Sequence, residues 1–129
     1  MVDIVKLIQQ QPNLYVMISV PEKEINQAEQ TLGLHFSADY RAYIAAFGAV
    51  SFAGHELTGI CKSNRLNVVT ITLSERENVT VPADWYVLEQ ANIDSIVLWQ
   101  SGDGTIYATA PNSKPEKIAN SLSEYIISR

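Results

Sequence analysis

The hydrophobic positions in the first quarter of the chain recur at helical spacing in two segments. The first segment predicts a short helix that closes at Pro12. The second predicts a longer helix that begins at a Ser19–Glu22 capping box and ends at Gly33, a residue suited to a helix C-terminus. The apolar positions are Ile4, Leu7 and Ile8 in the first helix, and Ile25, Ala28 and Leu32 in the second.

A third helix is predicted from Ser37 to Gly48, with Ser37 as its N-terminal cap. Its apolar face is mostly aromatic, so we expect this helix to contribute much of the hydrophobic core. The expected core positions are Tyr40, Tyr43, Ile44 and Phe47, packed together with Ile25 and Leu32.

The second half of the chain is rich in residues that favour β-strands. Residues 85–119 predict a small antiparallel meander, in which Ser101–Gly104 forms a hairpin turn. A short helix is expected after a capping box at Ser121–Glu124. Residues 67–77 fit either state, because their β-branched residues favour a strand while Leu66, Val69 and Leu73 have helical spacing. The predicted strands are Trp85–Leu88, Ser95–Gln100, Thr105–Thr109 and Glu116–Ala119.

These elements predict one α+β domain over residues 1–129, a mostly antiparallel sheet packed against N-terminal helices with a short C-terminal helix. The chain has 129 residues, 47% hydrophobic and 18% charged, which is typical of a globular domain. The longest apolar stretch, Ala42–Val50, is far shorter than the roughly 20 residues of a membrane-spanning helix. A single cysteine, Cys61, and the lack of an export signal lead us to expect a cytoplasmic protein.

The sequence contains no recognisable catalytic, cofactor or metal motif. Gly102-Asp103-Gly104 lacks the lysine and spacing of a phosphate-binding loop. His35 and His55 are the only histidines, too few with one cysteine to make a zinc site. His55 could pair with Cys61 or Ser51 as base and nucleophile, but no orienting acid is apparent, and a loop histidine bonded to backbone is preferred. We therefore expect no enzyme activity, no cofactor and no metal.

Aromatic residues in the predicted meander suggest two roles. Trp85, Trp99, Tyr86 and Tyr107 could stack on the bases of single-stranded nucleic acid, but such platforms are interleaved with lysine and arginine, which are scarce here. The net charge of −5 also argues against a general nucleic-acid binder. Packing in the core is the preferred interpretation.

Acidic residues are concentrated in one segment. From Glu75 to Asp103 the chain has six acids and a single base, Arg76, so this segment carries the whole net charge of −5. Such asymmetry favours a partner with a cationic surface, although the acids could equally serve solubility alone. The candidate partner-binding residues are Glu75, Glu77, Asp84, Glu89, Asp94 and Asp103.

A longer pattern resembles a known family. The signature runs from Ile25 through Ala28-Glu29 and Leu32-Gly33-Leu34 to Phe36, and then through Asp39-Tyr40-Arg41 and Tyr43-Ile44 to Phe47-Gly48. It resembles the opening of the SUKH superfamily, relatives of fungal cell-wall-synthesis regulators that include many bacterial immunity proteins. Segment 51–60, the 102–107 hairpin and the closing 119–126 segment are also similar, so the resemblance covers residues 19–127. Ser37-Ala38 stands where the family often has a proline.

This resemblance implies an α+β fold and an antitoxin that binds a cognate toxin domain, often a nuclease, without a catalytic residue or cofactor of its own. We expect the toxin domain to have a basic surface, and the protein to be a monomer or weak homodimer that contacts neither nucleic acid nor membrane directly. A regulatory interaction module, for example in cell-envelope synthesis, is the alternative.

Overall fold

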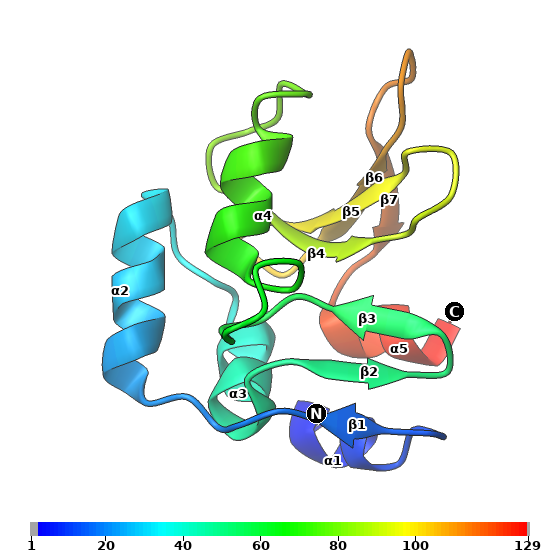
Figure 1. Ribbon diagram of the computed structural model, residues 1–129. Coiled ribbons are helices and arrows are strands. Elements are labelled where there is room, and N and C mark those ends of the chain that lie inside the picture. Colours follow the sequence, from blue (N-terminus) through cyan, green and yellow to red (C-terminus); the bar gives the residue numbers. More distant parts are fainter. Residues whose placement is uncertain (1–2, 129) are drawn as a thin grey trace.

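The computed structural model describes residues 3–128, which form an α+β domain, as the sequence predicts (Figure 1). Its strands form two antiparallel sheets, whereas the sequence predicts only the one over residues 85–119. The helices of this range are α1 (Ile4–Gln9), α2 (Glu22–Leu32), α3 (Ala38–Phe47), α4 (Val68–Glu75) and α5 (Leu122–Ser128). One sheet has the strand order β1 (Tyr15–Val16), β2 (Val50–Phe52), β3 (His55–Leu57). The other has the order β4 (Tyr86–Gln90), β5 (Val97–Gln100), β6 (Ile106–Thr109), β7 (Glu116–Ala119), which confirms the predicted meander.

Local capping explains where the predicted helices begin and end. The Ser37 hydroxyl accepts a hydrogen bond from the Tyr40 amide at 3.3 Å, and α2 ends at Gly33 in a left-handed conformation. The predicted Ser19–Glu22 capping box is wrong, because α2 has Pro21 as its N-cap and no side-chain cap. At α5 the Ser121 hydroxyl does accept from the Glu124 amide, at 3.1 Å.

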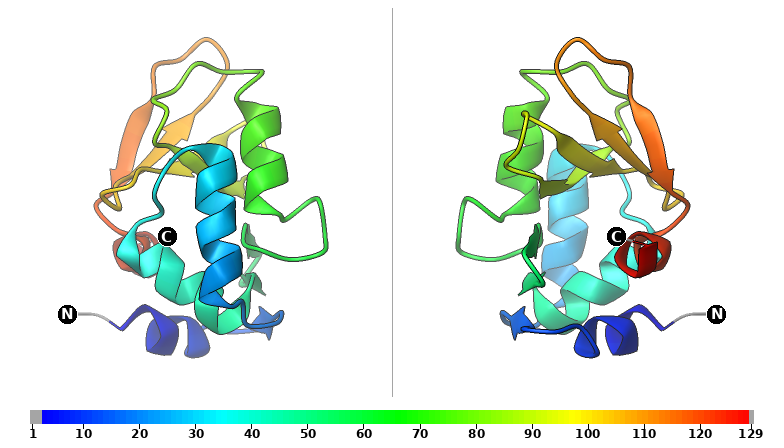
Figure 2. Two further views of the ribbon diagram at one scale, coloured as in Figure 1. Left: turned by 90° about the vertical axis from the view of Figure 1, so that its left-hand side faces the viewer. Right: turned by 90° about the vertical axis from the view of Figure 1, so that its right-hand side faces the viewer.

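The ambiguous segment 67–77 folds as helix α4. The Asn67 side chain accepts hydrogen bonds from the amides of Val69 and Thr70, at 3.0 and 3.2 Å. On the inner side of the helix, Thr72 is fully buried and its hydroxyl accepts from the Val87 amide of β4 at 3.0 Å. The cap and this contact with the sheet outweigh the strand propensity of the β-branched residues. Figure 2 shows α4 standing beside α2.

The aromatic face of α3 lies at the centre of the main core, as predicted. Tyr40 and Tyr43 are fully buried, and the Tyr40 ring lies 4.8 Å from that of Tyr86 on β4. The Tyr43 hydroxyl donates to the Thr58 carbonyl at 2.8 Å and accepts from the Val50 amide at 3.1 Å. Because each hydroxyl has a partner, these polar groups can be buried without a large desolvation cost.

The two sheets meet at Thr58, which is only 2% exposed. Its amide donates to the Leu88 carbonyl at 2.9 Å, and its hydroxyl donates to the Val87 carbonyl at 2.7 Å. Gly59 follows, where a β-carbon would lie 1.7 Å from the Gly48 carbonyl oxygen. Only glycine permits this close approach of the chain after β3 to the end of α3.

A second hydrophobic cluster lies on the opposite face of the four-stranded sheet, against α4. It contains Trp85 and Trp99, 6% and 0% exposed, and the Trp85 ring stacks on that of Tyr107 at 4.2 Å. Both tryptophans therefore pack inside the protein, which confirms the preferred interpretation of these aromatic residues.

Candidate partner-binding site

The structure separates the six predicted acidic residues into four places. Glu75 and Asp94 line a groove at one end of the four-stranded sheet. Asp84 and Asp103 lie beside the β5–β6 turn at the other end, and Glu77 is exposed just after α4. Glu89 is buried. Sequence neighbours are therefore not spatial neighbours, and the residues do not form one continuous acidic patch.

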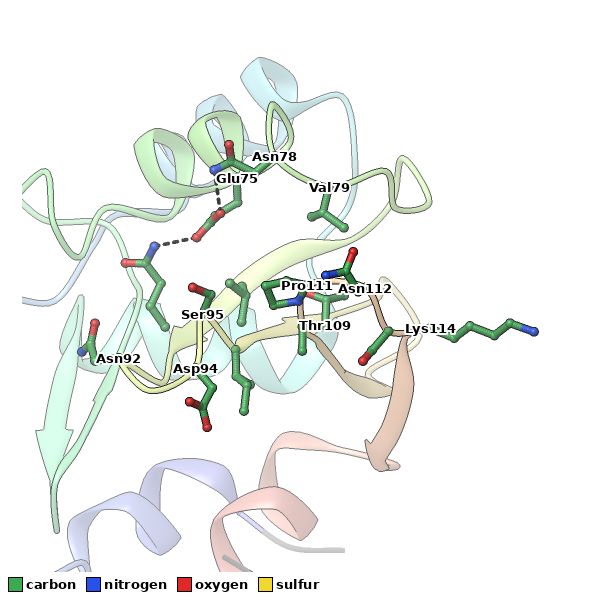
Figure 3. A pocket seen from close by; sticks show the side chains of 15 residues that line it. Glu75, Asn78, Val79, Asn92, Asp94, Ser95, Thr109, Pro111, Asn112 and Lys114 are labelled. Atoms are coloured by element: carbon green, nitrogen blue, oxygen red, sulfur yellow. Dashed lines mark hydrogen bonds between the residues drawn. The ribbon is translucent and has the colours of Figure 1, made fainter.

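The groove has a volume of about 960 Å³ and lies between the C-terminal end of α4 and the sheet (Figure 3). Its walls are the loops that contain residues 92–96 and 110–114, and the side chains of Glu75, Asn78, Val79 and Gln90 complete its lining. This volume lies in the range of known ligand-binding clefts. The lining includes side-chain amides and hydroxyls as well as apolar groups, so it can satisfy a polar occupant.

Glu75 is the carboxylate held inside this groove. Its Oε1 accepts from the Asn78 side-chain amide at 3.2 Å, and its Oε2 accepts from the Gln90 side-chain amide at 2.8 Å (Figure 3). Asp94 and Lys114 lie at the rim, and Figure 3 shows their charged ends directed outward. Among residues 3–128, neither Glu75 nor Asp94 forms an ion pair.

Left-handed backbone is concentrated in the groove loops. Of the six non-glycine residues with positive φ within the described range, four line the groove: Asn92, Asp94, Ser95 and Asn112, with φ from 52° to 61°. Asparagine and aspartate tolerate this conformation better than other non-glycine residues, and three of the four residues are of these types. The groove loops are therefore built from tight turns.

The aspartates at the other end hold the β5–β6 turn, which confirms the hairpin predicted at Ser101–Gly104. The Asp103 carboxylate accepts from the Ser101 hydroxyl and, at 3.0 Å, from the Thr105 amide. The Ser101 hydrogen bond is the main cause of the lowered pKa of Asp103, followed by the Thr105 amide. Asp84 accepts from the Gly102 amide at 3.4 Å. Both carboxylates thus have internal partners.

Glu89 is not part of a partner-binding surface, contrary to the prediction. It is 4% exposed and accepts hydrogen bonds from the Tyr125 hydroxyl at 2.6 Å and from His55 Nδ1 at 2.9 Å. Strand β4 places it at the junction of β3 and α5, where these donors offset the cost of burying a carboxylate. No local pattern in the sequence indicates this cluster, because its members are far apart along the chain.

His55 also differs from its predicted place. It lies on β3 rather than in a loop, and its ring bonds to a carboxylate rather than to backbone. The structure pairs it with Glu89, whereas the thiol of Cys61 bonds to the Ser63 carbonyl at 3.6 Å. Sequence reasoning missed the acid that orients this imidazole.

Residues 3–128 contain no group of three or more histidine, cysteine, aspartate or glutamate residues placed to hold a metal ion. Within the same range, every helix is too short or too polar to cross a bilayer.

Comparison with known families adds the decisive observation. The profile of the SUKH_5 family, described as SMI1-KNR4 cell-wall, matches residues 1–128. The chain belongs to this family. A search of curated proteins finds no match. SUKH_5 membership confirms the resemblance drawn from residues 19–127, and it is consistent with a protein-binding immunity domain without naming the partner.

Proposed function

We propose that this SUKH_5 domain is a non-enzymatic immunity protein that binds and neutralises a bacterial toxin domain, for example a nuclease, in the cytoplasm. The observation that carries the proposal is membership of the SUKH_5 family, and exposed acidic side chains at separate places on the surface support it. Four of the acids from Glu75 to Asp103 are exposed: Glu77, Asp84, Asp94 and Asp103. Glu75 is half-buried and lines the groove without an ion pair to any residue from 3 to 128.

Arg76 forms no ion pair with any residue from 3 to 128. Arg76, the only base of the segment, directs its guanidinium at the carbonyl oxygens of Leu32 and Ala83, at 3.3 and 3.2 Å. A nuclease has a basic groove for its substrate, and an acidic surface is complementary to it. Complementary charge would speed the encounter of the two proteins in a salt-dependent way.

The test is the rate of association with a candidate toxin domain, measured at 0.1 M and 1 M salt. The Debye length falls from about 10 Å to about 3 Å over this range, so an electrostatic contribution should weaken. Glu75→Lys with Asp94→Lys should lower the association rate about tenfold at low salt. Asp84→Lys with Asp103→Lys should have a smaller effect on the rate, because these carboxylates are engaged in the turn.

A matched control reverses two exposed acids outside the segment, Glu24 on α2 and Glu116 on β7. This variant has the same net charge as each test variant, and it should retain the association rate. Rescue of cells that express the toxin should follow the same order. If no paired reversal alters association or rescue, the acidic residues serve solubility and the toxin is bound elsewhere.

A second candidate function is regulation of cell-envelope synthesis through protein contacts. The family description, SMI1-KNR4 cell-wall, favours it. Purification of the protein with its native partners separates the two functions. Recovery of a toxin fragment supports immunity, whereas recovery of a kinase or an envelope synthase supports regulation.

A further inference from the structure

We infer that the groove receives an arginine side chain from an extended segment of the partner protein, with Glu75 as the residue that binds its guanidinium. The inference rests on the proposed function, because it names the part of the partner that this site would bind. It is carried by the hydrogen bonding of Glu75, the apolar lining beside it, and the position of α4.

The hydrogen bonds to Glu75 leave its carboxylate suited to a guanidinium. Each oxygen accepts one side-chain amide, from Asn78 at 3.2 Å and from Gln90 at 2.8 Å. A carboxylate oxygen can accept two hydrogen bonds, so one position remains on each oxygen. An arginine fork supplies two parallel N–H donors and matches this arrangement, whereas lysine supplies a point charge.

The electrostatic setting also favours a cation. Glu75 is the last residue of α4, where the helix dipole places partial negative charge. Its two amide partners are neutral, and Lys114, the cation at the rim, is directed away from the groove (Figure 3). A partner arginine would therefore meet a negative potential inside the groove without competition from an ion pair within the described part of the chain.

The rest of the lining suits the remainder of the segment. Val79 and Val97 line the groove and can contact the three methylene groups of an arginine stem. Asn92 and Asn112, on opposite loops, offer side-chain amides that can donate to or accept from an extended backbone.

The probe is an acetylated and amidated Gly-Ser-Arg-Ser-Gly peptide, titrated into the intact protein and followed by NMR. Its matched control carries citrulline, which keeps the shape of arginine but has no charge. We expect shift changes at residues 92–96, at residues 110–114 and at the side-chain amides of Asn78 and Gln90. The citrulline peptide should bind at least about tenfold more weakly, since it loses the charge-assisted hydrogen bonds to Glu75.

Two protein variants complete the experiment. Glu75→Gln should weaken binding of the arginine peptide about tenfold, whereas Asp84→Asn, the same loss of charge outside the groove, should leave it unchanged within about twofold. The citrulline comparison uses the unaltered protein, so it decides the matter even if Glu75→Gln perturbs the fold. Equal binding of both peptides, shift changes centred on residues 101–104, or no binding at millimolar peptide would each overturn the inference.

The peptide experiment needs no toxin, so its failure can be told apart from failure of the proposed function. If the arginine peptide binds in the groove but no toxin is neutralised, the groove inference stands and the immunity proposal fails. If the toxin is neutralised but the arginine and citrulline peptides bind equally, the immunity proposal stands and the groove inference fails.

Discussion

The two ends of the four-stranded sheet use similar acidic residues in different ways. At the turn end, around residues 101–104, Asp103 and Asp84 accept hydrogen bonds from backbone amides. At the groove end, Glu75 accepts only from side-chain amides and Asp94 stands at the rim of the groove. Carboxylates at the turn end thus stabilise the fold, while those at the groove end remain available to a partner. The neighbours of a carboxylate decide its role, and its position in an acidic run does not.

The largest loss of stability is expected when Asp39 is substituted. This residue of α3 holds the turn end of the sheet through its carboxylate. Its carboxylate accepts from the Ser37 hydroxyl, from the buried Gln100 amide at 3.2 Å and from the Leu122 amide at 2.8 Å. Asp39→Ala should lower the free energy of unfolding by about 2–3 kcal/mol, because these donors lose a charged acceptor. Urea denaturation measures the change. A loss below about 1 kcal/mol would show that the turn end is not held by this carboxylate.

The second-largest loss of stability is expected when Tyr86 is substituted. Its hydroxyl accepts from the Ser37 amide at 3.0 Å and donates to Gln100 Oε1 at 2.8 Å, inside the core. Tyr86→Phe should cost about 1–2 kcal/mol of stability, since buried groups lose a partner. Tyr107→Phe, on the other face of the same sheet, is the control and should stay within about 0.5 kcal/mol. Equal losses of stability from the two substitutions would contradict the role given to the Tyr86 hydroxyl.

A smaller loss of stability, which depends on pH, is expected when Asp103 is substituted. The pKa of this carboxyl is lowered in the folded protein, mainly by the Ser101 hydroxyl, so its charge stabilises the fold above the ordinary value of 3.8. This stabilisation is lost as the pH falls from 3.8 through the lowered pKa. Asp103→Asn should therefore be less stable than the unaltered protein at pH 7, and the difference should shrink below pH 3.8. Denaturation curves at pH 7, 5 and 3 test this; a difference that stays constant would refute it.

The smallest change in stability is expected for a substitution at the groove end. Asp94→Asn should change the free energy of unfolding by less than about 0.5 kcal/mol, because the side chain is exposed at a loop. Asparagine also tolerates the left-handed backbone found at this position, with φ of 52°. Thermal unfolding measured beside Asp103→Asn gives the comparison directly. A loss as large as that at Asp103 would remove the distinction between the two ends.

Much of the fold follows from local signals in the sequence. Ser37 and Gly33 mark helix ends because a cap acts on residues one turn away. The same locality explains the failures. Ser19 looks like a cap in sequence, but the chain turns into α2 only at Pro21. At 67–77 propensity and spacing disagreed, and contact with β4 through Thr72 decided for a helix.

The candidate site depended on contacts that no local pattern reveals. Glu89 lies among the predicted acids, but its donors are at positions 34 residues before it and 36 residues after it. The groove combines α4 with two loops that are separate in the chain. Composition therefore indicated the acidic character of the segment correctly, whereas the direction in which each carboxylate points required the three-dimensional structure.

Helix α5 has a consequence for the order in which the protein can fold during synthesis. It supplies the Leu122 amide to Asp39 and the Tyr125 hydroxyl to the buried Glu89. A ribosome makes the chain from its N-terminus, so a nascent chain that ends at Ala119 contains all seven strands of the two sheets described here but neither of these donors. Within the described range, Asp39 would then retain only Ser37 and Gln100 as donors, and Glu89 would retain only His55. Each carboxylate would lack the donor that α5 supplies. The nascent protein should thus stay sensitive to protease until residues 122–126 have emerged, and only then reach its native state.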